Sequence, residues 1–444
     1  MERILELAKQ RADHAEVFRI ERNHLPVCYR GGKIATVEAE DMVGTTLRVI
    51  VNGRLGFSST THPTEAEELV DRAVAAAQVG PEISLAFPDV VVRYGQTAVY
   101  DPAVAALTAA DLIETGNAMV GTVLAAFPDI GISAEMSRAI ENVTVMNTHG
   151  GHVSYSKTLY QAFAAILMTL HEDRAELEHG YSGTHLDDGP MDVANQAVWR
   201  FNNCHRVVPL RGGRLPVIFT SLSFRGIYVP LYFALNGMAA HRKTSLLAER
   251  IGDKVAHEAF SIADDPAMPT LPGSCPCDDE GVPTRRLPLI ERGVFRNFFY
   301  DLRAAGLAGV ASTGNGFKKG SLYEGFRLDA PPSGYPANFV LEPGELTLEQ
   351  MIGDIKHGII VDDVIGAGQG NNLNGEFSMS VALGYKVENG EITGRIKDVM
   401  VAGNIFDLLP NLRGMTRQRF SEDTLFGRYL VPWTCFDDVS VATQ

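Results

Sequence analysis

The sequence predicts an α+β fold, with helices and antiparallel sheets in an N-terminal lobe and a strand-rich antiparallel C-terminal lobe. Two observations carry this prediction. Apolar residues recur at helical spacing in a few separate segments, whereas most other apolar segments are short and strand-like. Glycine- and asparagine-containing pairs typical of hairpin turns separate these strands. Neither a G-x-G-x-x-G pattern nor a P-loop follows a predicted strand, so nucleotide binding is not indicated.

The composition sets limits on size, location and partners. A chain of 444 residues with 45% hydrophobic content can form two or three lobes with cores of their own. No apolar run approaches the length of a membrane span, and the charged, amphipathic N-terminus lacks the apolar region of a secretory signal. The net charge of −15 disfavours contact with nucleic-acid phosphates. We therefore expect a soluble chain that binds neither DNA nor membranes.

The five cysteines do not form a disulfide framework. Their number is odd and their spacing is scattered, which favours a reducing cytoplasm as the location. Cys275 and Cys277 are the only close pair, and they are too close together for the C-x₂₋₄-C spacing of a structural zinc site. We therefore predict no metal at this pair.

The N-terminal segment predicts a short helix at 2–12, followed by short strands within 15–60. Gly31-Gly32 suits a tight turn between two of these strands. Asn52-Gly53 is a strong hairpin signal. The segment therefore predicts an antiparallel sheet.

A clearer helix is predicted at 64–78. Thr64 and Glu67 have the spacing of a capping box, and Gly80-Pro81 ends the pattern. Apolar residues at helical spacing are expected to pack on the sheet: Leu69, Val70, Ala73 and Val74.

Two further helices are predicted in the first half. Thr108 opens one of them, with Asp111 at the capping-box offset, and Phe127-Pro128 ends it. The other fits residues 191–203. Strands are predicted between them, with turns at Glu141-Asn142 and Gly150-Gly151.

The second half predicts a large antiparallel or barrel-like lobe. Residues 223–247 are expected to be partly helical despite Pro230, and Asn389-Gly390 marks another hairpin turn. The predicted domains are 1–205, with sub-blocks of about 1–100 and 101–205, and 206–444.

The segment HEDRAELEHG (171–180) places a His directly before a Glu, as zinc metallopeptidases do. A zincin uses H-E-x-x-H on one helix, so that two imidazoles face one ion. After His171 and Glu172, however, the next His is His179, which lies about 12 Å further along a helix. Both rings cannot come within roughly 2.0–2.1 Å of one zinc ion. The segment therefore predicts a strand that runs into a charged surface turn.

Three blocks resemble the TldD/PmbA family, whose members are often labelled modulators of DNA gyrase. The most specific block (361–409) reads VDDVIGAGQGNNLNGEFSMSVALGYKVENGEITGRIKDVMVAGNIFDLL. A second block (262–295) contains IADDPAMP and DDEGVPTRRLPLIERGVF, and a third covers 15–60 and the helix after it. The three blocks occur in the family's order and span nearly the whole chain.

The resemblance implies a subunit of a zinc protease. TldD-like members carry H-E-x-x-x-H and a later Cys that hold zinc, whereas PmbA-like members, also called TldE, lack the motif and pair with a TldD-like chain. The corresponding positions here are near Tyr228, Val229 and Phe233. No Cys occurs between Asn404 and Thr434, and Cys435 falls past that interval. The resemblance thus implies no catalytic residue, metal or cofactor in this chain, with zinc expected in a TldD-like partner.

The leading hypothesis is a non-catalytic subunit that helps a zinc-bearing partner to cleave unfolded or small peptides. A stand-alone enzyme is the alternative, because reactive side chains are densest at 275–285. Within that segment, the candidates for contact with a substrate or a partner are Asp279, Glu280 and Arg285. The same segment can also be interpreted as a solvated turn, in which these residues have no functional role. A third hypothesis is a homodimeric binding protein without chemistry.

Overall fold

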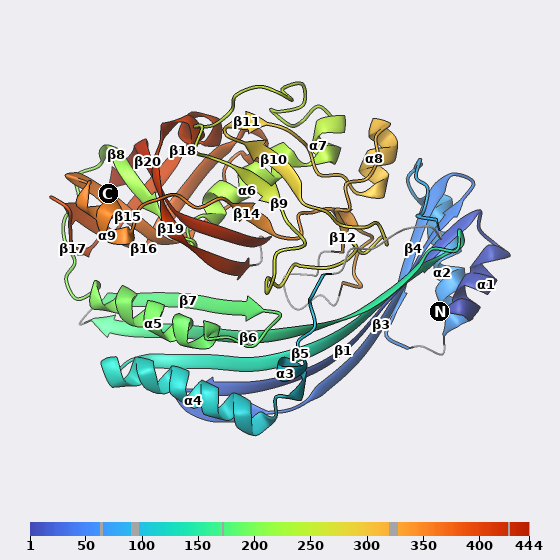
Figure 1. The fold of residues 1–444 in the computed structure, drawn as a ribbon, viewed down its shortest axis with the longest axis horizontal. Coiled ribbons are helices and arrows are strands. Elements are labelled where there is room, and N and C mark those ends of the chain that lie inside the picture. The colour runs from blue at the N-terminus through green and yellow to red at the C-terminus, as the bar shows by residue number, and fades with distance from the viewer. Residues whose placement is uncertain (63–64, 90–96, 171–172, 319–326, 425–426, 444) are drawn as a thin grey trace.

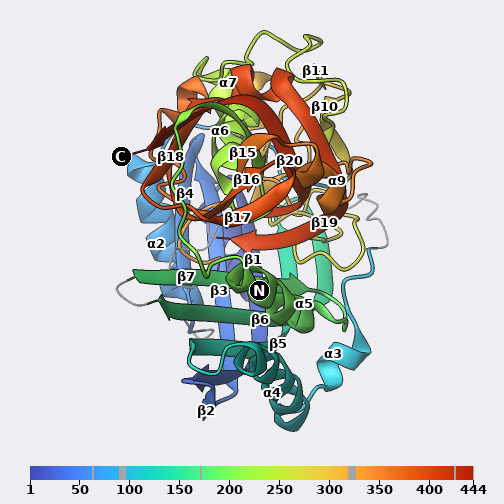
Figure 2. The same ribbon diagram turned by 90° about the vertical axis from the view of Figure 1, so that its left-hand side faces the viewer.

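A computed structural model describes residues 1–62, 65–89, 97–170, 173–318, 327–424 and 427–443. Within these ranges the chain forms one sheet from its first half and a larger sheet from its second half (Figure 1). The first sheet is long and curved, and the second half of the chain lies over its concave side (Figures 1 and 2). The predicted α+β class is confirmed.

The first sheet has seven strands in the order β4-β3-β1-β5-β6-β7, with β2 paired to β1 at the edge of this path. Its strands are β1 (His14–Arg30), β2 (Lys33–Val37), β3 (Glu40–Val51), β4 (Arg54–Thr60), β5 (Gly131–Asn147), β6 (His152–Leu170) and β7 (Asp173–Gly183). All its pairings are antiparallel. Because β1 pairs with β5, the sheet crosses the predicted sub-block boundary near residue 100.

The strands are longer than the sequence predicts. Asn52 and Gly53 form the predicted turn, with φ values of 50° and 74°. The predicted turn at Glu141-Asn142 is wrong, because β5 continues through it and Asn142 pairs with both Glu21 and Ser156. Polar residues in mid-strand gave the appearance of a turn, but cross-strand pairing on both sides keeps the backbone extended.

Helices of the first half cover the convex side of this sheet: α1 (Glu2–Lys9), α2 (Ala66–Val79), α3 (Pro102–Ala106), α4 (Ala109–Ala126) and α5 (Gly189–Asn202). The predicted packing of α2 is confirmed, since Leu69, Val70 and Ala73 are buried and Val74 packs partly buried beside them. The helix starts later than predicted, with Glu65 at the N-cap and no side-chain capping bond. Thr64 lies outside the described residues.

The capping box of α4 is confirmed. The hydroxyl of Thr108 accepts a hydrogen bond from the Asp111 backbone N–H, and the Asp111 carboxylate accepts one from the Thr108 backbone N–H. These two bonds satisfy donors that the first turn of a helix leaves free. The helix runs from there to Ala126, where the Phe127-Pro128 pair ends it.

The second sheet has eleven strands and is mixed rather than purely antiparallel, because β14 pairs in parallel with β20 and β15 in parallel with β8. Its strands are β8 (Gly213–Phe219), β9 (Ile262–Asp264), β10 (Leu287–Glu291), β11 (Val294–Phe295), β14 (Phe339–Leu341), β15 (His357–Ile365), β16 (Glu376–Glu388), β17 (Glu391–Arg395), β18 (Val399–Asn404), β19 (Leu412–Thr424) and β20 (Gly427–Thr443). β12 (Gly316–Phe317) and β13 (Ser333–Gly334) form a separate pair. The second-half helices are α6 (Arg225–Leu235), α7 (Gly237–His241), α8 (Leu302–Ala308), α9 (Leu348–Gly353) and α10 (Ile405–Leu408). Within the described ranges, no helix is both long and apolar enough to cross a membrane.

The two halves share hydrophobic core. One cluster joins α4 and α5 to residues of the second sheet such as Ile218, Tyr385 and Trp433. A smaller cluster on the concave face packs Phe18 and Val145 against Cys277. The boundary near residue 205 stays a prediction, and apolar surface is buried across it on both sides of the first sheet.

A buried ionic bridge also joins the halves. Arg48 of β3 donates to Glu16 of β1 at 2.8 Å and to Glu280 of the second half at 2.5 Å. All three side chains are at most 2% exposed. Burial by itself would lower the pKa of Arg48, but the two carboxylates raise that pKa above its usual value. Each ion of this trio therefore depends on the others to remain charged in the interior.

We expect Arg48→Met to destabilise the fold by roughly 3–5 kcal/mol, because it leaves two buried carboxylates without their shared cation. Urea unfolding followed by circular dichroism measures the change. Arg3→Met is the matched control: Arg3 pairs with Glu67 at 2.9 Å, but its side chain is 70% exposed. That pair is worth at most about 1 kcal/mol. Equal losses for the two variants would contradict the assignment of Arg48 as a buried bridge.

Candidate functional site

The positions implied for the zinc motif lie on α6, in the middle of the second-half core. The helix begins after Phe224 and contains Pro230, as the sequence predicted. Tyr228 is fully buried and Val229 nearly so, whereas Phe233 is partly buried against the same core.

Aromatic rings surround Tyr228. Its ring meets Phe339 edge-on at 5.0 Å between centroids and lies 5.4 Å from Tyr429. One turn further along, Tyr232 stacks on Phe299 at 5.6 Å. Such offset and edge-on contacts add to the energy of burial itself. This part of α6 is therefore packed as hydrophobic core.

The side chains on α6 do not fit a zinc ion. Zinc is bound in proteins by thiolate, imidazole and carboxylate groups, and Tyr228, Val229 and Phe233 offer none of these. Cys435 belongs to the core cluster that contains α5, whereas its neighbour Phe436 belongs to the cluster that contains α6. Since side chains alternate along a strand, the Cys435 thiol points away from α6. Burial also raises its pKa to about 12, which keeps the thiol protonated.

The acidic segment after Cys277 is buried, so the predicted solvated turn is wrong for this part of the chain. Asp278, Asp279 and Glu280 are each at most 1% exposed. The Asp278 carboxylate accepts backbone N–H bonds from Glu280, Val282 and Gly316. The carboxylates thus stabilise a tight turn from inside, because the second half of the chain covers it.

The other two carboxylates are also occupied. Asp279 accepts the backbone N–H of Lys318 at 2.7 Å and a guanidinium hydrogen bond from Arg327 at 3.3 Å. Glu280 accepts the backbone N–H of Leu302 as well as Arg48. These contacts account for Asp279 and Glu280 as structural groups. Arg285, by contrast, is exposed.

The close cysteine pair is buried. Cys275 and Cys277 are 3% and 0% exposed, and burial raises the pKa of both thiols. Protonated thiols are poor nucleophiles and poor metal ligands. Among the described residues, no group of three or more His, Cys, Asp and Glu side chains is arranged to hold a metal ion.

The segment tested as a zinc motif is strand for most of its length. His171 and Glu172 lie outside the described residues. Residues 173–183 form β7, so the predicted surface turn is wrong there, and His179 is buried at 4% exposure. β7 is paired antiparallel to β6 along its whole length, so these residues form a strand of their own instead of a surface turn.

Sequence analysis missed a buried polar cluster between the two halves. Arg200 of α5 donates to Asp362 of β15 at 2.7 Å, and both are at most 1% exposed. Nearby, Nδ1 of His179 lies 4.0 Å from a carboxylate oxygen of Glu422 on β19. Burial is the main cause of both pKa shifts in this pair. It raises the pKa of Glu422 to about 7 and lowers the pKa of His179 well below its usual value. These residues are far apart in sequence, and no spacing signal connects them.

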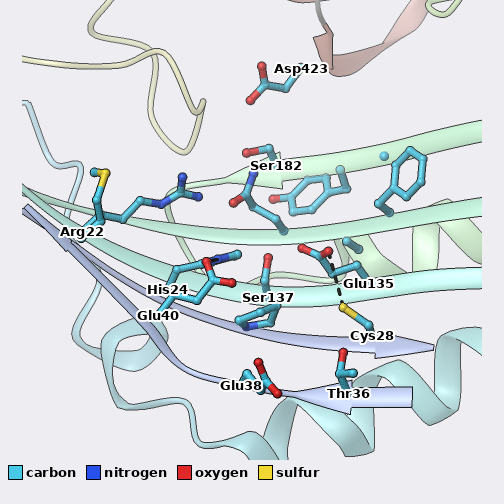
Figure 3. Close-up of a pocket in the computed structure, with 17 residues that line it drawn as sticks. Arg22, His24, Cys28, Thr36, Glu38, Glu40, Glu135, Ser137, Ser182 and Asp423 are labelled. Carbon is cyan, nitrogen blue, oxygen red and sulfur yellow. Dashed lines mark hydrogen bonds and ion pairs between the residues drawn. The ribbon is translucent and has the colours of Figure 1, made fainter. Parts of the chain in front are cut away.

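A cavity lies on the concave face of the first sheet, and we call it the inner-face pocket (Figure 3). Its volume is about 510 Å³, within the range of ligand pockets. Strands β1, β2, β3, β5, β6 and β7 contribute to its lining, and Asp423 of β19 faces them from the second half. Its lining residues are Arg22, His24, Pro26, Cys28, Thr36, Glu38, Glu40, Met42, Glu135, Ser137, Gln161, Ala162, Phe163, Gly180, Tyr181, Ser182 and Asp423.

Comparison with known proteins identifies the family. Residues 212–443, more than half of the chain, match the family described as PmbA/TldA metallopeptidase C-terminal domain. Residues 15–77 match PmbA/TldA metallopeptidase domain 1. The chain therefore belongs to the PmbA/TldA metallopeptidase family.

Relatives of both kinds named in this family are similar to the chain. A metalloprotease PmbA homolog from Haemophilus influenzae is 25% identical over 394 residues, covering 86% of this chain and 78% of the relative. A metalloprotease TldD homolog from the same organism is 25% identical over 296 residues, covering 63% and 59%. The crystal structure of TldE from Thermococcus kodakarensis has the same fold, with a TM-score of 0.89 at 23% identity over 100% of this chain and 99% of that one.

The raised pKa of Glu422 gives a test of the inter-half cluster. A carboxyl group whose pKa is about 7 when folded and about 4.5 when unfolded holds its proton more tightly in the folded state. Its contribution to stability is thus complete below pH 4.5 and is lost as the pH rises through 7. Glu422→Gln removes this loss, so the variant should gain roughly 2–3 kcal/mol relative to wild type between pH 5 and 8.

Urea unfolding of both proteins at several pH values measures that difference. Glu345→Gln, at an exposed position, is the control and should follow wild type throughout. Parallel curves for wild type and Glu422→Gln would show that Glu422 does not titrate in this range.

Proposed function

We propose that this chain is the PmbA/TldE-like, non-catalytic subunit of a metalloprotease that cleaves unfolded or small peptides in the cytoplasm. In this proposal a TldD-like partner chain supplies the zinc ion and the water that attacks the peptide. This chain completes the substrate chamber and holds the peptide. Membership of the PmbA/TldA metallopeptidase family supports the protease assignment.

The observation that carries the non-catalytic role is the chemistry of α6. Peptide hydrolysis at neutral pH needs an activated water, and in zinc proteases the metal activates it by lowering its pKa to about 7. At the three positions implied for the motif, this chain has a buried phenol ring, a valine and a phenylalanine that pack as core. The thiol of Cys435 is directed to the opposite face of β20 from α6.

The contacts of the acidic segment disfavour the stand-alone enzyme. Asp279 and Glu280 are engaged by backbone N–H groups and arginines, and they are closed off from solvent. A general acid or base must reach the proton that it transfers. A homodimeric binding protein without chemistry is an outcome that the experiments below distinguish.

Purified chain should contain well under one zinc per molecule. The reason is that none of the side chains at 228, 229 and 233 can bind the ion, and Cys435 is protonated and faces away. Elemental analysis of protein prepared without a metal-affinity column provides the measurement. A stoichiometric zinc that chelators remove would overturn the subunit assignment.

The isolated chain should not hydrolyse an unfolded peptide, whereas mixing it with the TldD-like protein of the same organism should create or greatly enhance activity. Cleavage of a fluorogenic unfolded substrate is measured for each chain alone and for the mixture. Chelation of the partner's zinc should abolish the activity. Chelator-insensitive proteolysis by this chain alone would show that it is an enzyme, and a mixture with no gain would favour the homodimer.

Tyr228→Phe is the control for this experiment. The proposal gives the Tyr228 hydroxyl no part in the chemistry, and the ring contacts with Phe339 and Tyr429 remain in the variant. The mixture made with this variant should therefore keep its activity. A loss of activity in a variant that still folds and still binds the partner would assign this hydroxyl a role that the proposal denies it.

A further inference from the structure

We propose that the inner-face pocket binds a lysine or arginine side chain of an extended peptide. The inference rests on the proposed function and specifies the class of substrate, namely peptides with a basic residue. Four kinds of observation support it: the charge of the lining, a buried hydroxyl group, the shape of the walls and a second cavity beside the first.

The charge of the pocket is negative. Its acidic residues are Glu38, Glu40, Glu135 and Asp423, and its basic residues are Arg22 and His24. The guanidinium of Arg22 lies 3.9 Å from Glu141, which is outside the pocket, and Arg428 pairs with Asp423 at 3.2 Å.

Among the described residues, no lysine or arginine lies within ion-pair distance of the remaining carboxylates, Glu38, Glu40 and Glu135. Burial lowers the pKa of His24, so the imidazole beside Glu40 is neutral near pH 7. Among the described residues, neither Glu38 nor Glu135 forms an ion pair. The Glu135 carboxylate accepts only a weak hydrogen bond from the Cys28 thiol at 3.8 Å. The pocket therefore favours a cation.

Ser182 provides an independent observation. It lies on β7 at the side of the pocket that faces Asp423 (Figure 3) and is 4% exposed, yet none of the described residues forms a hydrogen bond with its hydroxyl oxygen. Buried hydroxyl groups are nearly always hydrogen-bonded, because an unmade bond is costly. An ammonium or guanidinium group carries three to five N–H donors and can satisfy the hydroxyl and a carboxylate together.

The walls suit a long side chain rather than a compact ion. Pro26, Met42 and Phe163 give the pocket apolar surface between its charged groups. Lysine and arginine bury a hydrocarbon stem along such a surface while their charged end meets a polar partner. A divalent metal ion needs several ligands around one point, and among the described side chains no such group of three occurs.

A second cavity beside the pocket favours a peptide over a free amine. A second cavity of about 240 Å³ lies against β7, and residues 180–182 line both cavities. β7 is the edge strand of the first sheet. A peptide whose basic side chain occupies the inner-face pocket can therefore extend across β7, with the residues next to the basic one lying over this edge.

The test uses the full chain and three fluorescent ten-residue peptides that differ only at a central lysine, norleucine or glutamate. Fluorescence anisotropy should show the lysine peptide binding at least about fivefold more tightly than the norleucine peptide, with a preference that falls as salt is added. The glutamate peptide should bind most weakly. Equal affinities for lysine and norleucine would overturn the proposal.

Variants assign the preference to the pocket. The double variant Glu38→Gln and Glu135→Gln should lose the preference for lysine, and Ser182→Ala should weaken it. Glu114→Gln, on the exposed side of α4, is the control. It also replaces a carboxylate by an amide, but away from the pocket, and should behave as wild type. An unchanged preference in the double variant would place the basic side chain elsewhere.

Two further outcomes separate this inference from others. Binding of spermine as tight as that of the lysine peptide, and competitive with it, would assign the pocket to free polyamines and overturn the peptide claim. In the mixture with the TldD-like partner, the double variant should cleave lysine and norleucine peptides at similar rates. An active mixture whose preference is unaffected by the double variant would defeat this inference alone, whereas an inactive mixture would defeat the proposed function and leave the binding result standing.

Discussion

The guanidinium of Arg48 is the contact on which the arrangement of the two halves depends. It is surrounded by protein, and among the described residues it forms ion pairs with Glu16, directly opposite on the neighbouring strand β1, and with Glu280 from the other half. A buried ion that loses its partner is far more costly than an exposed one. The second half can therefore dock on the concave face in one position, with Glu280 over β3. The turn at 278–280 and the Asp279–Arg327 contact follow from that docking.

This docking also explains the position of the inner-face pocket. At one end of the concave face, Cys277 and Leu328 make apolar contacts and Arg327 pairs with Glu141. Further along the same strands, Asp423 of β19 faces side chains of β1, β5, β6 and β7, and these side chains line a cavity instead of a core. Because side chains alternate along each strand, the opposite face of these strands carries the residues that pack against α4 and α5. One set of strands thus contributes to the core with one face and lines the pocket with the other.

The aromatic residues of α6 contribute to the hydrophobic core and offer no zinc-binding groups. The family fold is retained at this helix, yet the residues at the motif positions stabilise the core instead of presenting ligands. A buried polar site costs stability unless every group is satisfied. Packed aromatic rings carry no such cost.

The sequence by itself determined the local structure and the family. The capping box of Thr108 and Asp111, the hairpin turn at Asn52-Gly53 and the buried face of α2 depend on neighbours within a few residues, so spacing alone predicts them. The absence of zinc ligands at 228, 229 and 233 could likewise be read from the sequence once the resemblance was recognised. The tertiary structure decided everything that depends on distant partners: the burial of residues 278–280, the unbroken β5, the cluster of Arg200 with Asp362, and the pocket. A charged residue reads as exposed until its counter-ion is known, and here the counter-ions lie up to 232 positions away in the chain.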